Sequence, residues 1–521
     1  MDKRIFRALI FLLIGVSLLV VVFILINRDT NKSSTVVTDD ITACVQEPDS
    51  DNLDHYQIDD ELSNKQIEIQ FGEEKIIFNT NQNYTVHELD ALYSDVPMQV
   101  ALNDSTHDFS NMKLSVNGEE IKKGGTQLSI DQLDKNKFLN VTLEYKDYKR
   151  NYCIQTLPDD FPEIEKYGIS EYGGEYYANF FAPSYILKMS EEGDILYYKK
   201  AENDQTLALF TKWKIGEKVR YSYFAERNTG VINRNSYNYG DMIIMDENYK
   251  VIDIVHSLPS EKFSVDTNHN LEMHDFIMID DGHYMLMNYV IDTPDKQDLS
   301  DTLKLNSRVF AAYVQEIKDD KIIWEWISTD YPEFYASSIE GNDYSNSDTY
   351  AADYMHINSL FIDPRDKNVI MSFRNQDSIV KVDKTTSEIL WRFGGKNDDF
   401  NLSDYQKTSR QHHATITSNG NLLIFDNGTL NKQTRIIEAK LDETEKRLVD
   451  YKEFKIDGAF SEFTGSVQKI NEDNDVFIIG WGMNRTQQPM MSVIDFRNQK
   501  VLTEVIEPNM EVDSYRFIRV K

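Results

Sequence analysis

The feature that most limits the fold of this chain is a hairpin pattern that returns throughout its length after residue 160. Each copy has a strand-like run, a polar turn and a second strand-like run, and the turns lie roughly 54 to 72 residues apart. The copies begin at Tyr185, Met242, Val314, Ile379, Arg435 and Ser492. Hairpin-rich repeats of this size are typical of β-propellers with several strands per blade, so six copies predict six blades.

A second hairpin precedes the first kind in three successive copies. These hairpins read MHDFIMIDDGHYMLMNY, MHINSLFIDPRDKNVIMSFRN and QHHATITSNGNLLIFDN. The first strand of a propeller blade is the innermost one, so these hairpins are expected to line the central channel. The terminal run SYRFIRVK predicts a strand that closes the ring against the first blade.

The part of the chain before the repeats has a different composition. Between residues 56 and 160, short alternating runs such as KQIEIQF and LNVTLEYKDY predict an antiparallel β domain. The predicted fold class is therefore all-β. The predicted segments are an anchor at 1–28, a polar tether at 29–55, a small β-sandwich-like domain at 56–160 and the six-bladed β-propeller at 161–521.

The N-terminal segment predicts a retained transmembrane anchor. The run from Ala8 to Ile26 carries no charge and is long enough to cross a bilayer core of about 30 Å. No small-x-small cleavage site follows it directly, so a cleaved signal peptide is less favoured. Because Lys3, Arg4 and Arg7 precede the run, we expect a single-pass protein of the cell membrane with its body on the extracytoplasmic side.

The chain has two cysteines, Cys44 and Cys153. In an oxidising compartment they can form a disulfide that ties down the N-terminal region. Two unrelated thiols are the alternative, and the sequence leaves both open. Two cysteines argue against a zinc–cysteine site or a disulfide scaffold.

The charge of the chain excludes one class of partner. It has 55 Lys and Arg against 87 Asp and Glu, a net charge of −32. Such a surface repels nucleic acids and anionic lipid headgroups, so we expect no nucleic-acid partner. An anionic small substrate needs a local cationic pocket in this acidic body.

Three histidines occupy the same position in the inner hairpins. His274, His356 and His412 open them, and in each hairpin the turn begins seven residues later, at Asp281, Asp363 and Asn419. A strand rises about 3.3 Å per residue, so equal offsets predict nearly equal depth in the channel. The three rings are therefore expected to converge at one mouth of the ring.

Two further polar residues belong to the blade of His356. Arg374 ends its second inner strand and returns to the same rim, while Asn358 lies two residues after His356, on the same predicted strand face. The set has many N–H donors and suits a tetrahedral oxyanion, with the planar fork of Arg374 binding two oxygens.

A metal site is the alternative for this cluster. Three histidines can hold zinc, with Asp275 or His413 as a further ligand. Arg374 at the same rim argues against this, because a metal ion repels a guanidinium. We expect no metal and no cofactor.

At this point the chain resembles a known family. The segments MHDF, DYMHINSLFIDPRDKNVIMSFRNQDSIVKVDKTTSEILWRFGG and RQHHATITSNGNLLIFDNG are similar to those of the bacterial arylsulfate sulfotransferases. The segment at the C-terminal end of the small β domain, YCIQTLPDDFPE, is also similar to the corresponding segment of that family. The resemblance covers most of the chain, and the block from Tyr354 to Gly395 is its most specific part.

The resemblance implies a six-bladed propeller that moves a sulfuryl group from a phenolic sulfate ester to a phenol without a nucleotide donor. By the Q-H-x-A motif, His412 is the nucleophile that is transiently sulfurylated. The supporting residues, which act in catalysis and substrate binding, match His274, His356, Asn358 and Arg374. Two positions depart from the family pattern: His413 stands where a smaller or acidic residue is expected, and Met273 stands where some members carry a polar one.

The expected partners are an aryl sulfate donor, a phenolic acceptor, the membrane through the N-terminal helix, and a second copy of the chain in a homodimer. Two other functions stay open. One is a non-catalytic extracellular propeller that binds a partner, and the other is a metal-dependent hydrolase. Which histidine acts as general acid or base also stays open.

Overall fold

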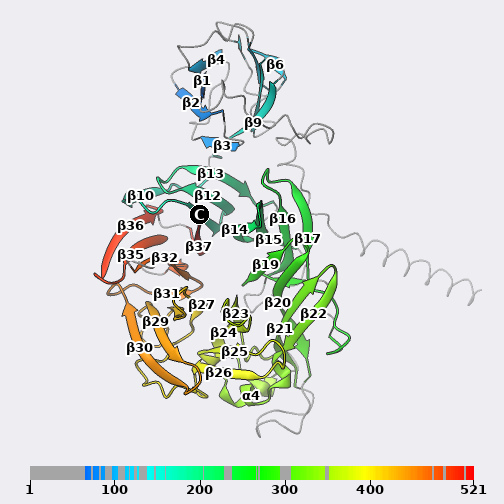
Figure 1. The fold of residues 1–521 in the computed structure, drawn as a ribbon, viewed down its shortest axis with the longest axis vertical. Coiled ribbons are helices and arrows are strands. Elements are labelled where there is room, and N and C mark those ends of the chain that lie inside the picture. The colour runs from blue at the N-terminus through cyan, green and yellow to red at the C-terminus, as the bar shows by residue number, and fades with distance from the viewer. Residues whose placement is uncertain are drawn as a thin grey trace, which may run out of the picture. The chain divides into compact units, whose positions relative to one another are not determined.

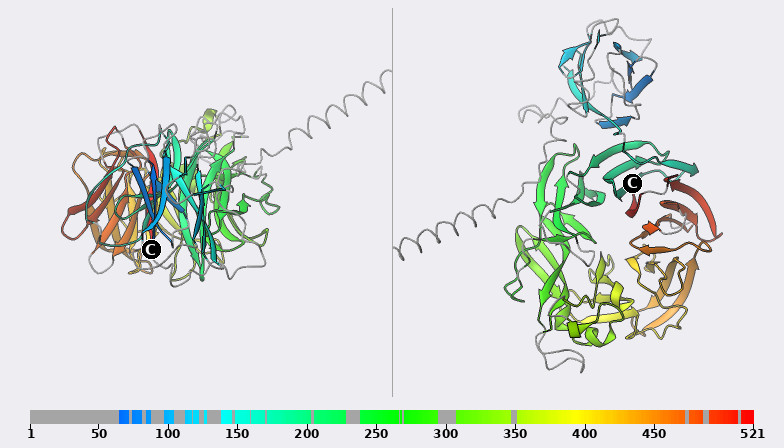
Figure 2. Two further views of the ribbon diagram at one scale, coloured as in Figure 1. Left: turned by 90° about the horizontal axis from the view of Figure 1, so that it is seen from above. Right: turned by 180° about the vertical axis from the view of Figure 1, so that it is seen from behind.

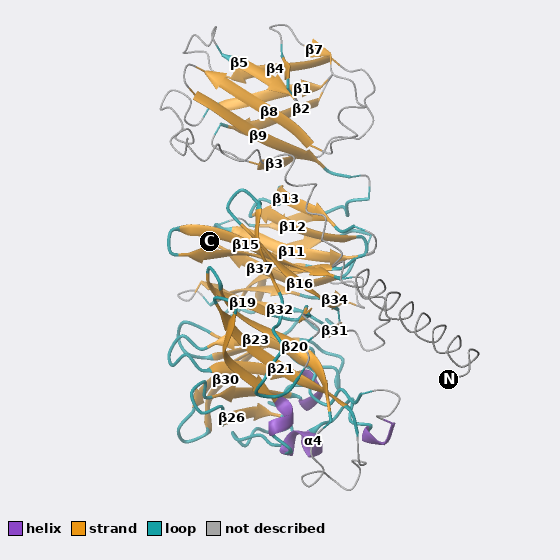
Figure 3. Ribbon diagram, turned by 90° about the vertical axis from the view of Figure 1, so that its right-hand side faces the viewer, coloured by secondary structure: helices purple, strands orange, loops and turns teal. Residues whose placement is uncertain are grey.

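The computed structural model describes the chain from residue 65 onward, except 72–73, 81–83, 88–96, 104–111, 117, 122–125, 128–137, 146–147, 159, 170, 203–204, 228–237, 266, 268–269, 294–306, 347–350, 472–474, 485–488 and 510–511. Nearly all regular structure in these residues is β-strand (Figure 3). The one α-helix among them is α4 (Glu333–Ser337). The short 3-10 helices include η3 (Ser328–Asp330), η4 (Tyr344–Asn346) and η5 (Arg374–Gln376). The predicted all-β class is confirmed.

Between residues 66 and 156 the strands form two sheets. The first has the order β2 (Glu74–Asn79), β1 (Gln66–Phe71), β4 (Pro97–Asn103) and β7 (Thr126–Gln127). The second has the order β3 (Tyr84–His87), β9 (Tyr148–Thr156), β8 (Phe138–Tyr145), β5 (Lys113–Val116) and β6 (Glu119–Glu120). One apolar core joins them, with Ile69 of the first sheet and Val141 of the second both fully buried. Alternating apolar residues thus give each sheet one buried face, as in a sandwich.

From residue 165 on, the described strands form six antiparallel sheets that follow one another around a ring (Figures 1 and 2). The first sheet has β13 (Ile195–Lys200), β12 (Ser184–Ser190), β11 (Glu175–Phe181) and β37 (Ser514–Val520). The second has β14 (Leu207–Ile215), β15 (Lys218–Glu226), β16 (Tyr239–Met245) and β17 (Val251–Val255), with the short β18 (Leu271–Glu272) paired to β16. The third has β19 (Phe276–Asp280), β20 (His283–Asp292), β21 (Val309–Lys318) and β22 (Lys321–Ile327).

The other three sheets repeat this order. The fourth has β23 (Ile357–Ile362), β24 (Val369–Phe373), β25 (Ser378–Val382) and β26 (Ile389–Gly394). The fifth has β27 (His412–Ile416), β28 (Leu422–Asp426), β29 (Arg435–Asp442) and β30 (Arg447–Phe454). The sixth has β32 (Ser466–Asn471), β33 (Val476–Gly480), β35 (Met491–Asp495), β36 (Lys500–Ile506) and β10 (Glu165–Gly168). The pair β31 (Ser461–Phe463) and β34 (Met483–Asn484) stands apart. Counted outward from the innermost strand, which is β37 in the first sheet, the six hairpins read from the sequence are the third and fourth strands of these sheets.

Two strand pairs close the ring. β37 pairs antiparallel with β11, with Val520 opposite Glu175. β10 pairs antiparallel with β36, with Glu165 opposite Ile506. The expectation that the terminal run closes the ring against the first sheet is confirmed.

The sheets pack face to face because both faces of their middle strands are apolar. In β24, Met371 belongs to a core shared with Val314 of the third sheet. The next residue back, Ile370, belongs to a core shared with Ile437 of the fifth sheet. Side chains that alternate along one strand thus enter two different interfaces. This continuous burial fixes the register of the inner strands, and with it the position of every residue at their ends.

Residues 1–64, which include the predicted anchor and tether and Cys44, lie outside the described residues. Cys153 lies in β9, and its pairing with Cys44 stays a prediction. Within the part of the chain that is described, no helix has the length and apolar character needed to cross a bilayer.

Candidate active site

A cavity of about 970 Å³ collects four of the five residues singled out in the sequence. His274 follows β18, His356 precedes β23, Arg374 begins η5 directly after β24, and His412 is the first residue of β27. All four line the cavity. Because they come from the starts of three successive inner hairpins and from the end of one, the shared offset read from the sequence does place them together.

His274 and His356 are each held by a carboxylate close by in the sequence. His274 Nδ1 lies 2.5 Å from Glu272 Oε2, which also accepts the His274 main-chain N–H at 2.8 Å. His356 Nδ1 lies 2.7 Å from Asp353 Oδ2, and its main-chain N–H donates to Asp353 Oδ1 at 3.2 Å. The two rings meet edge to face with centroids 5.1 Å apart. These contacts fix the orientation of both rings and engage Nδ1 in each.

His412 has a neutral partner instead. Its Nδ1 lies 2.7 Å from Asn427 Oδ1 and 3.2 Å from the main-chain carbonyl oxygen of Arg410. His412 as a whole residue is 3% exposed. Burial and the nearby Arg374 guanidinium lower the pKa of His412 well below its ordinary value, so the imidazole is neutral at physiological pH.

Arg374 supplies the positive charge of the cavity. Its Nη1 donates to Glu340 Oε1 at 2.9 Å and to Asn375 Oδ1 at 2.8 Å. Its guanidinium lies over the Phe463 ring, 5.6 Å from the centroid. Within the described residues, Nε and Nη2 of Arg374 make no hydrogen bond, so this edge of the fork is available to an anion.

Glu340 joins two arginines at the cavity. It also binds Arg410, which in turn pairs with Asp377. Burial raises the pKa of the Glu340 carboxyl, but Arg374 and Arg410 outweigh burial and hold that pKa below its ordinary value. Glu340 therefore stays ionised and orients Arg374.

Asn358 does not reach the cavity, contrary to its predicted face. It is fully buried, and its Nδ2 donates to the carbonyl oxygen of Gln411 at 2.8 Å. The reason is local: His356 has a left-handed φ of +50°, and a β-bulge falls between Ile357 and Ser359. A bulge breaks the simple alternation of side chains, so Asn358 packs against the segment that leads into His412.

His413 also lies away from the cavity. Its φ is +39°, at a β-bulge between His412 and Ala414, and its Nδ1 accepts the main-chain N–H of Val467 in β32 at 3.2 Å. Burial and the charge of Arg516 lower the pKa of His413 to about 3. His413 is therefore a neutral hydrogen-bond acceptor between two sheets.

Several residues of the site were not foreseen. Glu272, Asp353 and Asn427 hold the three rings, and Glu340 holds Arg374. One signal for Asn427 is present in the sequence, because it directly follows β28 just as Arg374 directly follows β24. The wall of the cavity is partly apolar, and it includes Met273, a residue that departs from the family pattern, together with Phe181, Phe463 and Met483.

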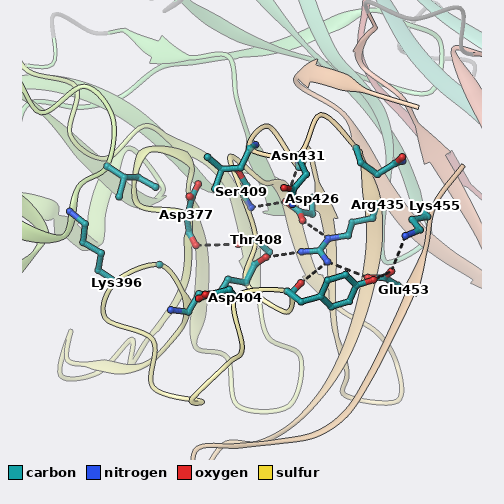
Figure 4. A pocket seen from close by; sticks show the side chains of 17 residues that line it. Asp377, Lys396, Asp404, Thr408, Ser409, Asp426, Asn431, Arg435, Glu453 and Lys455 are labelled. Carbon is teal, nitrogen blue, oxygen red and sulfur yellow. Dashed lines mark hydrogen bonds and ion pairs between the residues drawn. The ribbon is translucent and has the colours of Figure 1, made fainter. Parts of the chain in front are cut away.

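The structure has a second pocket, of about 450 Å³, which contains none of the predicted residues (Figure 4). Its central cation, Arg435, is already engaged by Asp426 at 2.8 Å and by Glu453 at 3.2 Å. In the part of the chain that is described, no group of three or more His, Cys, Asp and Glu residues is arranged to hold a metal ion.

Comparisons with known proteins bear on the same region. The model of the family described as arylsulfotransferase (ASST) matches residues 226–504, more than half of the chain. The chain is also similar to the arylsulfate sulfotransferase AssT of Escherichia coli O6:H1, with 27% identity over 195 residues. That match covers 29% of this chain and 32% of the relative, so it spans about a third of the relative's length.

Solved structures show weaker likeness. A protein of unknown function from Bacteroides caccae has a TM-score of 0.40 and 10% identity, over 67% of this chain and 99% of the other. Virginiamycin B lyase from Staphylococcus aureus has a TM-score of 0.31 and 10% identity, over 69% of this chain and 89% of the other.

Proposed function

The chain belongs to the arylsulfotransferase family, and on that premise we propose that it transfers a sulfuryl group from an aryl sulfate ester to a phenol in two displacements through His412. The observation that carries the proposal is the cavity that a neutral, buried imidazole and an arginine side chain both line. A neutral imidazole is a nucleophile, and a guanidinium binds sulfuryl oxygens.

In the first displacement, an imidazole nitrogen of His412 attacks sulfur while the bond from sulfur to the aryl oxygen breaks. The electron pair of that bond leaves on the phenolate, whose parent phenol has a pKa of about 10, so it departs with little proton help. Arg374 stabilises the charge on the sulfuryl oxygens. The apolar wall with Phe181 and Phe463 suits the aryl ring of the ester.

In the second displacement, the oxygen of the acceptor phenol attacks sulfur and the bond from nitrogen to sulfur breaks, returning its electron pair to His412. The acceptor must lose a proton in this step. We assign this proton to His274 or His356, because each ring is hydrogen-bonded to a carboxylate that can stabilise its protonated form. No nucleotide donor takes part in this proposal.

The test is a single-turnover experiment with an aryl sulfate alone. One phenol should be released per active site, and the added sulfuryl mass should be found in the peptide containing Gln411 to Gly420 after alkaline quenching. Replacing His412 with Ala should remove the burst and lower turnover about 10³-fold or more. The control is His413→Ala, which should keep the burst because His413 lies outside the cavity.

Other outcomes of this test select other functions. A folded protein that releases no phenol and gains no mass would instead be a binding module. Release of free sulfate that stops on chelation and returns with zinc would indicate a hydrolase. Normal turnover by His412→Ala, with loss in His413→Ala, would show that the nucleophile is wrongly assigned.

A further inference from the structure

The partner of His412 differs in kind from the partners of the other two cavity histidines. Glu272 and Asp353 present carboxylates to His274 and His356, whereas Asn427 presents an amide oxygen to His412. A carboxylate can neutralise a positive imidazolium, and an amide cannot. His412 therefore differs from His274 and His356 in having a neutral hydrogen-bond partner in place of a carboxylate.

The orientation of the Asn427 amide is fixed by its other end. Its Nδ2 donates to the main-chain carbonyl oxygens of Ser461 at 2.9 Å and of Thr464 at 3.0 Å. Carbonyl oxygens only accept, so the NH2 group must face them and Oδ1 must face His412. Asn427 is fully buried, so water does not compete for these bonds.

The same reasoning fixes the proton on His412. Both groups near its Nδ1, the Asn427 amide oxygen and the Arg410 carbonyl oxygen, are acceptors. In a neutral imidazole one nitrogen carries the hydrogen and the other carries the lone pair. Nδ1 must therefore be the N–H, and Nε2 must carry the lone pair.

We propose that Asn427 is a positioning residue that holds His412 in the neutral tautomer protonated on Nδ1, so that Nε2 is the nitrogen that accepts and releases the sulfuryl group. This inference rests on the proposed function. When Nε2 bonds to sulfur and the aryl oxygen leaves with its electron pair, the ring keeps the Nδ1 proton and becomes positive. A positive ring is a good leaving group, and the neutral amide does not cancel its charge.

The surroundings of His412 agree with this role. Besides burial and the Asn427 hydrogen bond, the largest influences on the pKa of the ring come from Arg374, His274 and His356, and none of these groups is an anion. Glu340, the nearest carboxylate to Arg374, is bound by Arg374 and Arg410. Two carboxylates that line the same cavity, Glu340 and Asp353, are hydrogen-bonded to Arg374 and His356. Burial and Arg374 keep the free imidazole neutral, so its lone pair stays available.

The first measurement reads the tautomer directly. Nitrogen NMR of the full chain, labelled with ¹⁵N in its histidine rings, distinguishes N–H from lone-pair nitrogens, and His412→Gln identifies the signals of His412. In the free protein between pH 6 and 8, we expect Nδ1 as N–H and Nε2 as the lone-pair nitrogen. Asn427→Leu, which removes the acceptor, should give a mixture of tautomers and slow phenol release about tenfold or more at every pH.

The second measurement uses Asn427→Asp, which keeps an acceptor but adds a charge. The carboxylate favours the protonated ring. The rate of phenol release should then rise about tenfold per pH unit below the new pKa, whereas the wild-type rate should be flat there. Rescue at high pH separates this effect from simple loss of structure.

A matched control is Asn288→Asp. Asn288 is also buried, and its Nδ2 also donates to two acceptors, Ser257 Oγ and the Asn270 carbonyl oxygen, each at 3.1 Å. Its Oδ1 accepts the main-chain N–H of Tyr289 and not a histidine ring. It should lose stability like Asn427→Asp without gaining the pH dependence.

The outcomes separate this inference from the proposed function. A wild-type spectrum with the hydrogen on Nε2, or an unchanged tautomer in Asn427→Leu, overturns the role of Asn427 even if the protein is active. The expected tautomer together with normal turnover by His412→Gln would support Asn427 as the residue that sets the tautomer and would defeat the proposed nucleophile.

Discussion

Two adjacent histidines at the start of β27 (His412–Ile416) have different surroundings because the backbone between them is irregular. The bulge after His412 and the left-handed φ of His413 send the two rings to different neighbours. His412 lines the cavity, and His413 accepts a hydrogen bond from the sixth sheet. Burial keeps both imidazoles neutral, so the stability of the folded protein should depend on pH in the acidic range.

Because of these histidines, we expect the free energy of unfolding to decrease as the pH is lowered from 6.5. Each has a folded pKa below the ordinary value of 6.5, and that of His413 is about 3. Between about pH 3 and 6.5 the unfolded chain binds more protons, so stability is lost as pH falls, by up to about 1.4 kcal/mol per pH unit for each histidine.

The measurement is urea unfolding between pH 7.5 and 5. His413→Gln keeps an acceptor for the Val467 N–H but cannot titrate, so its stability should depend less on pH than that of the wild type. If the free energy of unfolding had the same dependence on pH in both proteins, His413 would not be a group whose pKa is lowered by folding.

Regular spacing in the sequence predicts the positions of some site residues and not of others. The three histidines and Arg374 were placed correctly because their offsets from the turns are regular. Asn358 lies elsewhere because the alternation of side chains breaks after His356, whose left-handed φ the sequence pattern does not predict. Asn427 was overlooked although it matches Arg374 in its position after the second strand.

The strand β37 (Ser514–Val520) completes the first sheet and also contacts residues next to the cavity. Its Arg516 is buried and donates to both carboxylate oxygens of Asp275, at 3.0 and 3.3 Å. Its Tyr515 hydroxyl donates to the carbonyl oxygen of His274 at 3.1 Å. The strand that closes the ring therefore also supports the backbone of a cavity histidine.

Removal of residues 514–521 should abolish cooperative folding of the propeller. It leaves β11 without its neighbour on one edge and leaves the buried Asp275 without a cation, and the second loss alone costs about 3–5 kcal/mol. Circular dichroism and calorimetry measure the effect. Removal of the exposed Lys521 alone is the control and should leave the melting temperature unchanged. A cooperative transition near the wild-type temperature in the longer deletion would show that β37 is dispensable.

The elements themselves were largely predictable. Hairpins with alternating or continuous apolar runs appear where the sequence places them, because burial on both faces leaves each strand one register. The short β10 (Glu165–Gly168) was not foreseen, because its pairing with β36 depends on the end of the ring and not on its own composition.

We propose that the part of the molecule from residue 29 onward, here called the body, works outside the cytoplasmic membrane. The basic residues before the run from Ala8 to Ile26 motivate this orientation. Protease added to spheroplasts should digest the body while a cytoplasmic marker stays intact. Complete protection of the body until lysis would reverse the proposed topology.

The closing pair of β11 and β37 has a consequence for how the protein is made. Among the described strands, β37 comes last in the chain, yet it belongs to the first sheet. A ribosome has therefore produced every other blade strand before the first sheet can be finished. A chain without β37 lacks the strand pair that closes the ring and the hydrogen bond to the His274 carbonyl oxygen, so we expect the cavity to form only after β37 has been synthesised.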